Sequence, residues 1–310
     1  MNQTREILSK VTQVATCGKH ECRSGKVELS TLHFQKGTLM LLQIITIYDL
    51  CDAFLRAYGH KDDPQAKLTT AEVMTAALVA AWFFHGNQSL ACQFLKEQGE
   101  MPQMLCKSRF NRRLHQIPEA LWQGLFALLS QLHQQMNPDG EYIIDSCPVP
   151  VCDNLRIRRC RLYRGEDYRG FCASKRRYFY GLKIHLVVTA SGKPVEMVLT
   201  PGEVHDTPGM RSMPWDLPAD SEIYADKGYT DYEFEDALAD CDLHLIAARK
   251  KNSQRPHPGH IGYLCQVIRK RVETTFSGIA EHFARSIHAV TPRGFELKIV
   301  LTVLAYSIVG

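Results

Sequence analysis

The sequence lacks the cysteine pairs that mark most zinc and redox motifs. None of its 11 cysteines forms a Cys-x-x-Cys pair. Cys17, His20 and Cys22 could supply half of a zinc site, but no convincing second half follows. Scattered reduced thiols are typical of a cytosolic protein rather than a disulfide scaffold.

Long apolar runs are missing as well. The most apolar segments, 73–84 and 299–309, are too short to cross a membrane and are typical of core helices. The N-terminus shows no compact apolar segment before a small-residue cleavage site. The chain also contains no internal repeat and no low-complexity tract. We therefore expect a cytoplasmic protein without a membrane partner.

A substantial core is available, because 45% of the 310 residues are apolar. Residues 1–38 show no clear periodicity and are predicted to be a loose N-terminal arm. Residues 39–138 are predicted to form a helical domain, with helices over 41–58, 69–84, 89–97, a short basic segment capped by Ser108, and 118–136. Thr69 and Glu72 have the spacing of a capping box. Asn137, Pro138, Asp139 and Gly140 then break the pattern.

Residues 139–310 change to a β pattern. Strands are expected at 141–145, 180–190, 194–200, 222–226 and 243–248, with helices over 232–240 and 264–283. Apolar residues on the last helix recur at helical spacing, which predicts one buried face. The order predicts an α/β domain with a mixed five-stranded sheet flanked by helices.

The positive charge is unevenly distributed. Residues 153–183 contain ten lysines and arginines against three acids, and residues 249–271 contain seven without an acid. The net charge is only +4, so the rest of the chain is acidic. The first basic segment also interleaves tyrosines and phenylalanines. Two such segments favour a nucleic-acid partner over solvated surface charge.

Three acids stand out by position. Asp145 and Asp226 each come at the predicted end of a strand, and Glu273 lies on the last predicted helix of the sheet domain. Singly, each has an ordinary explanation: a strand end, a turn, or a helix-surface pair with Arg269 or Lys270. If the three converge, their mutual repulsion calls for divalent cations with oxygen ligands, Mg²⁺ or Mn²⁺.

The segments IIDSCPVP, IYADKGYTDYE and RKRVETTF resemble the three motif blocks of bacterial insertion-sequence transposases with the DDE triad. ASKRRYFYGLKIHLVVTASGKPV and TPGEVHDTPGM resemble the blocks between them. The resemblance implies a ribonuclease-H-like fold, with Asp145, Asp226 and Glu273 as the catalytic triad and ligands of two metal ions. His205 and Asp206 form a further pair, in which Asp206 is an alternative second acid or a helix cap.

The family chemistry implies cutting and joining of double-stranded DNA at transposon ends by two-metal phosphodiester chemistry, in a homodimer. A nuclease of the same fold that cuts without joining, or a DNA-binding protein that no longer cuts, remains an alternative. Arg109, Arg112 and Arg113 follow a turn, as in a helix-turn-helix reader, or simply form the charged face of a packing helix. The residues expected to contact DNA are Arg109, Arg112, Arg113, Lys175, Arg176, Arg177, Lys183, Lys227, Lys250, Lys251, Arg269, Lys270 and Arg271.

Overall fold

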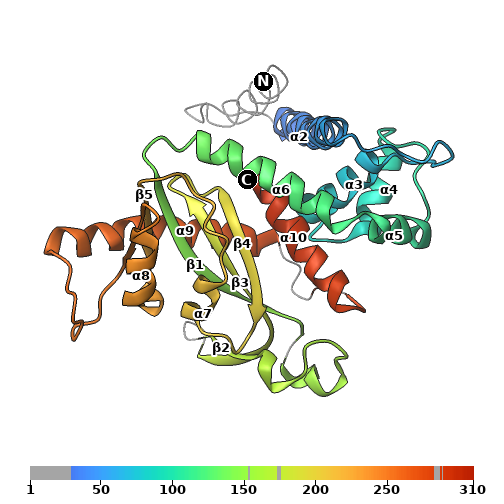
Figure 1. Ribbon diagram of the computed structural model, residues 1–310. Coiled ribbons are helices and arrows are strands. Elements are labelled where there is room, and N and C mark those ends of the chain that lie inside the picture. The colour runs from blue at the N-terminus through green and yellow to red at the C-terminus, as the bar shows by residue number, and fades with distance from the viewer. Residues whose placement is uncertain (1–28, 153, 173–175, 283–286, 288) are drawn as a thin grey trace. The chain divides into compact units, whose positions relative to one another are not determined.

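The computed structural model describes residues 29–310 except 153, 173–175, 283–286 and 288 (Figure 1). The chain forms two compact units. One contains the chain up to Leu125 together with Val300–Gly310, and the other contains Phe126–Ile299. The division passes within two helices, α6 (Glu119–Gln135) and α10 (Pro292–Val309). The domain boundaries given above stay a prediction.

The first unit is helical. It contains α2 (Leu29–Tyr58), α3 (Thr70–Phe83), α4 (Gln88–Glu97) and α5 (Lys107–Gln116), with the adjoining parts of α6 and α10. The capping box of Thr69 and Glu72 is confirmed at the start of α3. The predicted arm is wrong over 29–38, because α2 already begins at Leu29. Ser108 does not cap α5: the cap position is Cys106, which makes no side-chain cap bond.

One segment corrects the expectation about membrane-length runs. Thr38–Tyr58 in α2 is long and apolar enough, by length and composition, to cross a membrane. The core helix of a soluble protein passes the same test. Several of its apolar side chains, including Ile47 and Cys51, are fully buried within the protein. The segment is therefore weak evidence for a membrane span.

The second unit is built on a mixed six-stranded sheet. Its strands are β1 (Glu141–Pro150), β2 (Arg169–Cys172), β3 (Arg177–Thr189), β4 (Pro194–Pro201), β5 (Ser221–Ala225) and β6 (Leu243–Ala247). The order along the sheet is β2-β3-β1-β5-β6, with β4 also paired to β3. β1, β5 and β6 are parallel, whereas β3 runs antiparallel to β1, β2 and β4. Short 3-10 helices η1 (Asn154–Arg159), η2 (Glu166–Tyr168) and η3 (Lys227–Tyr229) lie in the connections.

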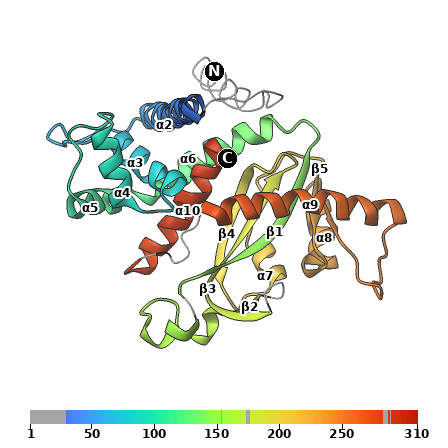
Figure 2. The same ribbon diagram turned by 180° about the vertical axis from the view of Figure 1, so that it is seen from behind.

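Helices cover both faces of this sheet (Figures 1 and 2). α9 (Gly259–His282) crosses one face, and α7 (Asp206–Arg211) and α8 (Tyr232–Ala239) lie on the other. The core on the α7 and α8 side joins alternate residues of the parallel strands to Met210, Met213 and Leu238. This is the ribonuclease-H-like α/β arrangement that the sequence predicted, with one strand more.

The differences from the prediction have local causes. β2 was not predicted because its four residues, Arg-Gly-Phe-Cys, carry no readable alternation. β1 does not end at Asp145 but continues to Pro150, because β3 pairs with it as far as Gly181. Pro148 and Pro150 are tolerated there, since the parallel pairing with β5 has already stopped at Ile144.

Candidate active site

The first predicted acid lies where two parallel strands separate. The last register pair between β1 and β5 joins Ile144 to Ala225. Asp145 and Asp226 are the next residues on the two strands, so their main chains lie side by side at about the strand spacing of 5 Å. Both are half-buried. The carboxyl ends of parallel strands are where open α/β sheets bind ligands.

Each aspartate is held by its own main chain. The Asp145 carboxylate accepts the Ser146 N–H at 2.8 Å, and the Asp226 carboxylate accepts the Lys227 N–H at 2.6 Å. Asp226 therefore caps η3, one residue beyond the strand it was expected to end. Asp226 thus both caps a helix, as Asp often does, and lies beside Asp145. These local bonds fix where each carboxylate stands relative to its strand.

The reserve acid lies on the other side of β1. Asp206 Oδ1 accepts the Ser146 hydroxyl at 2.8 Å, and the Lys183 ammonium lies 3.3 Å away. Lys183 also donates to the Val204 carbonyl at 2.8 Å. Strand alternation places Ser146 on the face opposite to Asp145. Asp206 is the first residue of α7, after the cap position His205, so it does not cap that helix.

A buried histidine lies next to Ser146 on the neighbouring strand, β3. His185, with 0% of its surface exposed, pairs across the sheet with Ser146. Its ring contacts the Thr200 hydroxyl at 3.1 Å and the Tyr229 hydroxyl at 3.4 Å. Burial lowers the pKa of His185 to about 4, so the ring is neutral at physiological pH. Burial, with Asp206 and Asp145 nearby, raises the pKa of Tyr229.

The third predicted acid lies on α9. Near the start of that helix the Cys265 thiol lies 3.8 Å from the Ile246 carbonyl of β6. Ten residues later Thr275 donates to the Gly192 carbonyl in the β3–β4 turn at 3.3 Å. α9 therefore crosses the strands from β6 towards β3, as Figure 2 shows. Glu273 is exposed, away from the buried residues Cys265, Ile268, Thr275 and Ile279.

The cations predicted to meet DNA fall at different places. Lys227, Lys250 and Lys251 are exposed and lie in the connections that follow the carboxyl ends of β5 and β6. Arg177 begins β3, nine residues before Leu186, the partner of Asp145 in the register. Nine residues of strand span roughly 30 Å, so Arg176 and Arg177 lie well beyond the carboxyl edge. Lys175 lies outside the described residues, and so do the side chains of Arg269, Lys270 and Arg271.

Sequence reasoning missed the group formed by Ser146, His185 and Tyr229. Ser146 adjoins Asp145 and Tyr229 follows Asp226 by three residues, so position was an available signal for both. His185 gave no such signal, because a histidine within an apolar strand is usually a satisfied core residue. The register of β1 and β3 brings Ser146 to His185, and Tyr229 of η3 joins them through its contact with the His185 ring.

The donor set fits a hard divalent cation, since Mg²⁺ and Mn²⁺ prefer carboxylate oxygens. Asp145 and Asp226 supply two adjacent carboxylates at one edge of the sheet. Within the described parts of the chain, no group of three or more His, Cys, Asp or Glu side chains is close enough to hold a metal ion. Glu273 therefore does not complete a three-acid site in this structure.

Comparisons with curated proteins and with solved structures give no match. A family model described as the transposase DDE domain matches residues 135–282. The matched segment runs from the end of α6 to the end of α9, so it includes the whole sheet and all three predicted acids. Residues 135–282 therefore belong to the transposase DDE domain family.

Proposed function

We propose that this protein is an insertion-sequence transposase of bacterial type, which cuts DNA at the ends of its element and joins them to a target. The observation that carries the proposal is the level placement of Asp145 and Asp226 where β1 and β5 separate, inside a transposase DDE domain. Asp145, Asp226 and Glu273 are the catalytic residues in this reading.

The two aspartates would hold Mg²⁺ or Mn²⁺. Two such ions, when bound, would activate the attacking water or DNA 3′-hydroxyl and stabilise charge on the leaving 3′ oxygen. The protein's part is to keep both carboxylates fixed relative to the DNA. The bonds from the Ser146 and Lys227 N–H groups serve that end, because each one holds a carboxylate oxygen beside the end of the parallel pairing.

Helix geometry supports Glu273 as the third acid. At about 100° per residue, Glu273 lies roughly 120° around α9 from the centre of its buried stripe. A right-handed helix that crosses from β6 to β3 on the face opposite α8 turns this flank towards the carboxyl ends of the parallel strands. Alternation along β1 turns Asp145 to the same face of the sheet as α9.

The charge around the site supports a DNA substrate. The exposed residues Lys227, Lys250 and Lys251 come after the carboxyl ends of β5 and β6, the same edge of the sheet at which the two aspartates lie. They can contact phosphates on either side of the reacting one. We further propose that two copies act together as a homodimer, one on each element end, and that the protein works in the cytoplasm on the nucleoid.

The test is metal-dependent cleavage of a duplex that carries the element's end. Asp145→Asn, Asp226→Asn and Glu273→Gln should each reduce Mg²⁺-dependent and Mn²⁺-dependent cleavage by orders of magnitude while the chain stays folded. Glu281→Gln is the matched control, because Glu281 is an exposed acid on the same helix as Glu273. Cleavage by Glu273→Gln at the level of Glu281→Gln would remove Glu273 from the triad.

Two further outcomes separate the alternatives. A wild-type chain that cuts but never joins a pre-cut end to target DNA would be a nuclease of the same fold. A chain that binds DNA and cuts with neither metal would be a DNA-binding protein that has lost its activity. Asp206→Asn tests the reserve acid: loss of cleavage there with full activity in Asp226→Asn would exchange their roles.

A further inference from the structure

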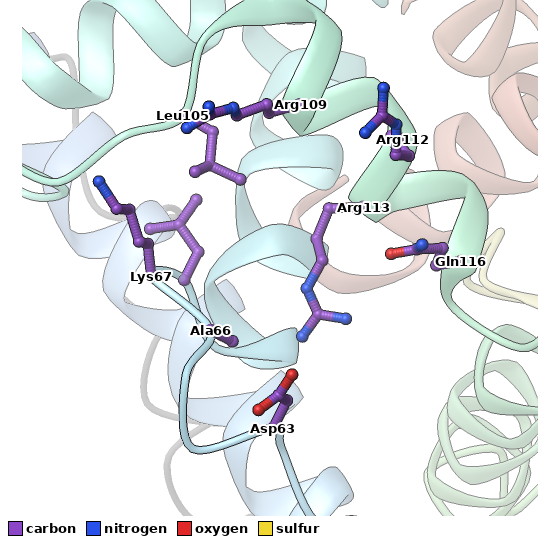
Figure 3. A pocket seen from close by; sticks show the side chains of 9 residues that line it. Asp63, Ala66, Lys67, Leu105, Arg109, Arg112, Arg113 and Gln116 are labelled. Carbon is purple, nitrogen blue, oxygen red and sulfur yellow. The ribbon is translucent and has the colours of Figure 1, made fainter.

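A pocket of about 330 Å³ lies in the helical unit (Figure 3). One wall is a single face of α5, where Arg109, Arg112, Arg113 and Gln116 recur at helical spacing. The opposite wall is the segment between α2 and α3, which contributes Asp63 and Lys67. Figure 3 shows Arg109 and Lys67 on one side of the pocket, Arg113 pointing towards Asp63, and Arg112 and Gln116 further along α5. Four cations against one acid make it strongly positive.

The pocket is not the surface of a helix-turn-helix reader. In that motif a turn of about three or four residues joins the two helices. Here α4 ends at Glu97 and α5 begins only at Lys107. The α5 face that carries the arginines is also walled by the segment 63–68, so it is not free to lie in a major groove.

Arg113 differs from the other cations. Its guanidinium lies 3.3 Å from Asp62 Oδ1 and 3.5 Å from the Thr70 hydroxyl. The same Asp62 oxygen accepts the Thr70 N–H at 2.9 Å. Arg113 thus ties α5 to the first turn of α3 and to the segment that carries Lys67. Its charge is largely neutralised within the protein.

Lys67, Arg109 and Arg112 are exposed. Among the described residues, no acid lies within ion-pair distance of any of the three. Cations gathered around a hollow repel one another, so an anion that fills it gains from all three. The pocket is large enough for a phosphate group but too small for a DNA duplex or a protein helix.

We propose that Lys67, Arg109 and Arg112 hold a phosphate of the DNA backbone in this pocket, with Arg113 as the structural support of its wall. The inference rests on the proposed function, which makes DNA the substrate. It adds that the helical unit grips DNA without reading its sequence, because phosphate contacts carry no base information.

The experiment measures binding of the full chain to two labelled duplexes of unrelated sequence, in EDTA, over a range of salt concentrations. Arg109→Ala, Arg112→Ala and Lys67→Ala should each weaken binding equally on both duplexes. Each should also lower the slope of log K against log salt, and the triple variant should lower it by about 0.9, the effect of one lost phosphate contact. Lys107→Ala is the matched control, since Lys107 is an exposed cation of α5 outside the pocket.

Unchanged slopes in Arg109→Ala and Arg112→Ala would overturn the proposal, and so would a loss confined to one duplex, which would indicate base reading. Inorganic phosphate at constant ionic strength distinguishes a pocket for a free anion. If phosphate raises the Tm of wild type but not of Arg109→Ala, while DNA slopes stay unchanged, the DNA assignment falls. Because EDTA removes cleavage from the assay, a chain that fails to cut leaves this result intact.

Discussion

Gly209 in α7 lies against the ring of the buried His185, and its replacement by alanine tests how tightly that side of the site is packed. A methyl group at Gly209 would stand 2.3–2.8 Å from three atoms of the imidazole, whereas ordinary contacts begin at 3.4 Å. Ring and helix would have to separate by roughly 1 Å. The ring cannot turn away easily, because Thr200 and Tyr229 hold it from both nitrogens.

Two effects oppose each other in Gly209→Ala. Alanine favours a helix over glycine by about 1 kcal/mol. Forcing an extra methyl group into a close-packed core costs about 1–3 kcal/mol, and the approach of 2.3 Å belongs at the upper end. We therefore expect a net loss of about 1–2 kcal/mol and a Tm lowered by about 2–4 °C for each kcal/mol. DNA cleavage should fall as well, because a displaced α7 carries Asp206 away from Ser146, whose N–H holds the Asp145 carboxylate.

Gly262→Ala is the matched control. Gly262 also lies in a helix, but a methyl group there meets nothing within 4 Å. This variant should be as stable as wild type or slightly more stable. Thermal unfolding of both variants beside wild type decides the point. If Gly209→Ala melts at or above Gly262→Ala, the packing of α7 on His185 is not as close as described.

Three further predictions concern other parts of the chain. Burial raises the pKa of Glu196 to about 7 from an unfolded value of 4.5, so its contribution to stability is present below about pH 4.5 and is lost as the pH rises through 7. In denaturant unfolding, the free energy of unfolding of Glu196→Gln should rise relative to that of wild type by up to roughly 3 kcal/mol between pH 5 and pH 8.5. A difference between the two proteins that does not change with pH would contradict this. Arg113→Ala should lose about 1 kcal/mol in a thermal melt, because Asp62 loses the guanidinium contact but keeps both bonds from Thr70, whereas Lys107→Ala should not. Replacing Arg176 and Arg177 by alanine should weaken binding only of duplexes that extend about nine base pairs or more from the cut, since these residues lie roughly 30 Å from Asp145; a slower cleavage of bound DNA would instead place them near the reaction.

The sequence predicted the parts of the fold that have strong periodicity. The capping box of Thr69 and Glu72, the hairpin of β3 and β4 and the order of the remaining strands agree with the structure. β2 escaped prediction because its pairing with the start of β3, and not its own composition, makes it a strand. The same holds for the second half of β1, where β3 overrides two prolines.

Near the candidate site, the strand pattern predicted that Asp145 and Asp226 lie level, as they do, although β1 itself continues to Pro150. Their role stays a prediction. The contacts between Lys183, Asp206 and Ser146 could not be read from spacing, since they join three elements that are distant in the sequence. Lys183, expected to meet DNA, has a side chain that is only 15% exposed and donates within the protein. The sequence shows that a lysine is present, but it does not show whether the ammonium group donates to DNA or to another group of the protein.

The long stretch of sequence between β1 and β5 also has a consequence for the order of folding. β3 and β4 are joined by a short turn and can pair as soon as both are made. The pairing of β1 with β5 must close a loop that includes β2, β3, β4 and α7, which makes it slow. Asp145 and Asp226 meet only when that loop closes. We therefore expect a chain to pass most of its folding time with a hairpin formed and its two aspartates far apart, and so without activity towards DNA.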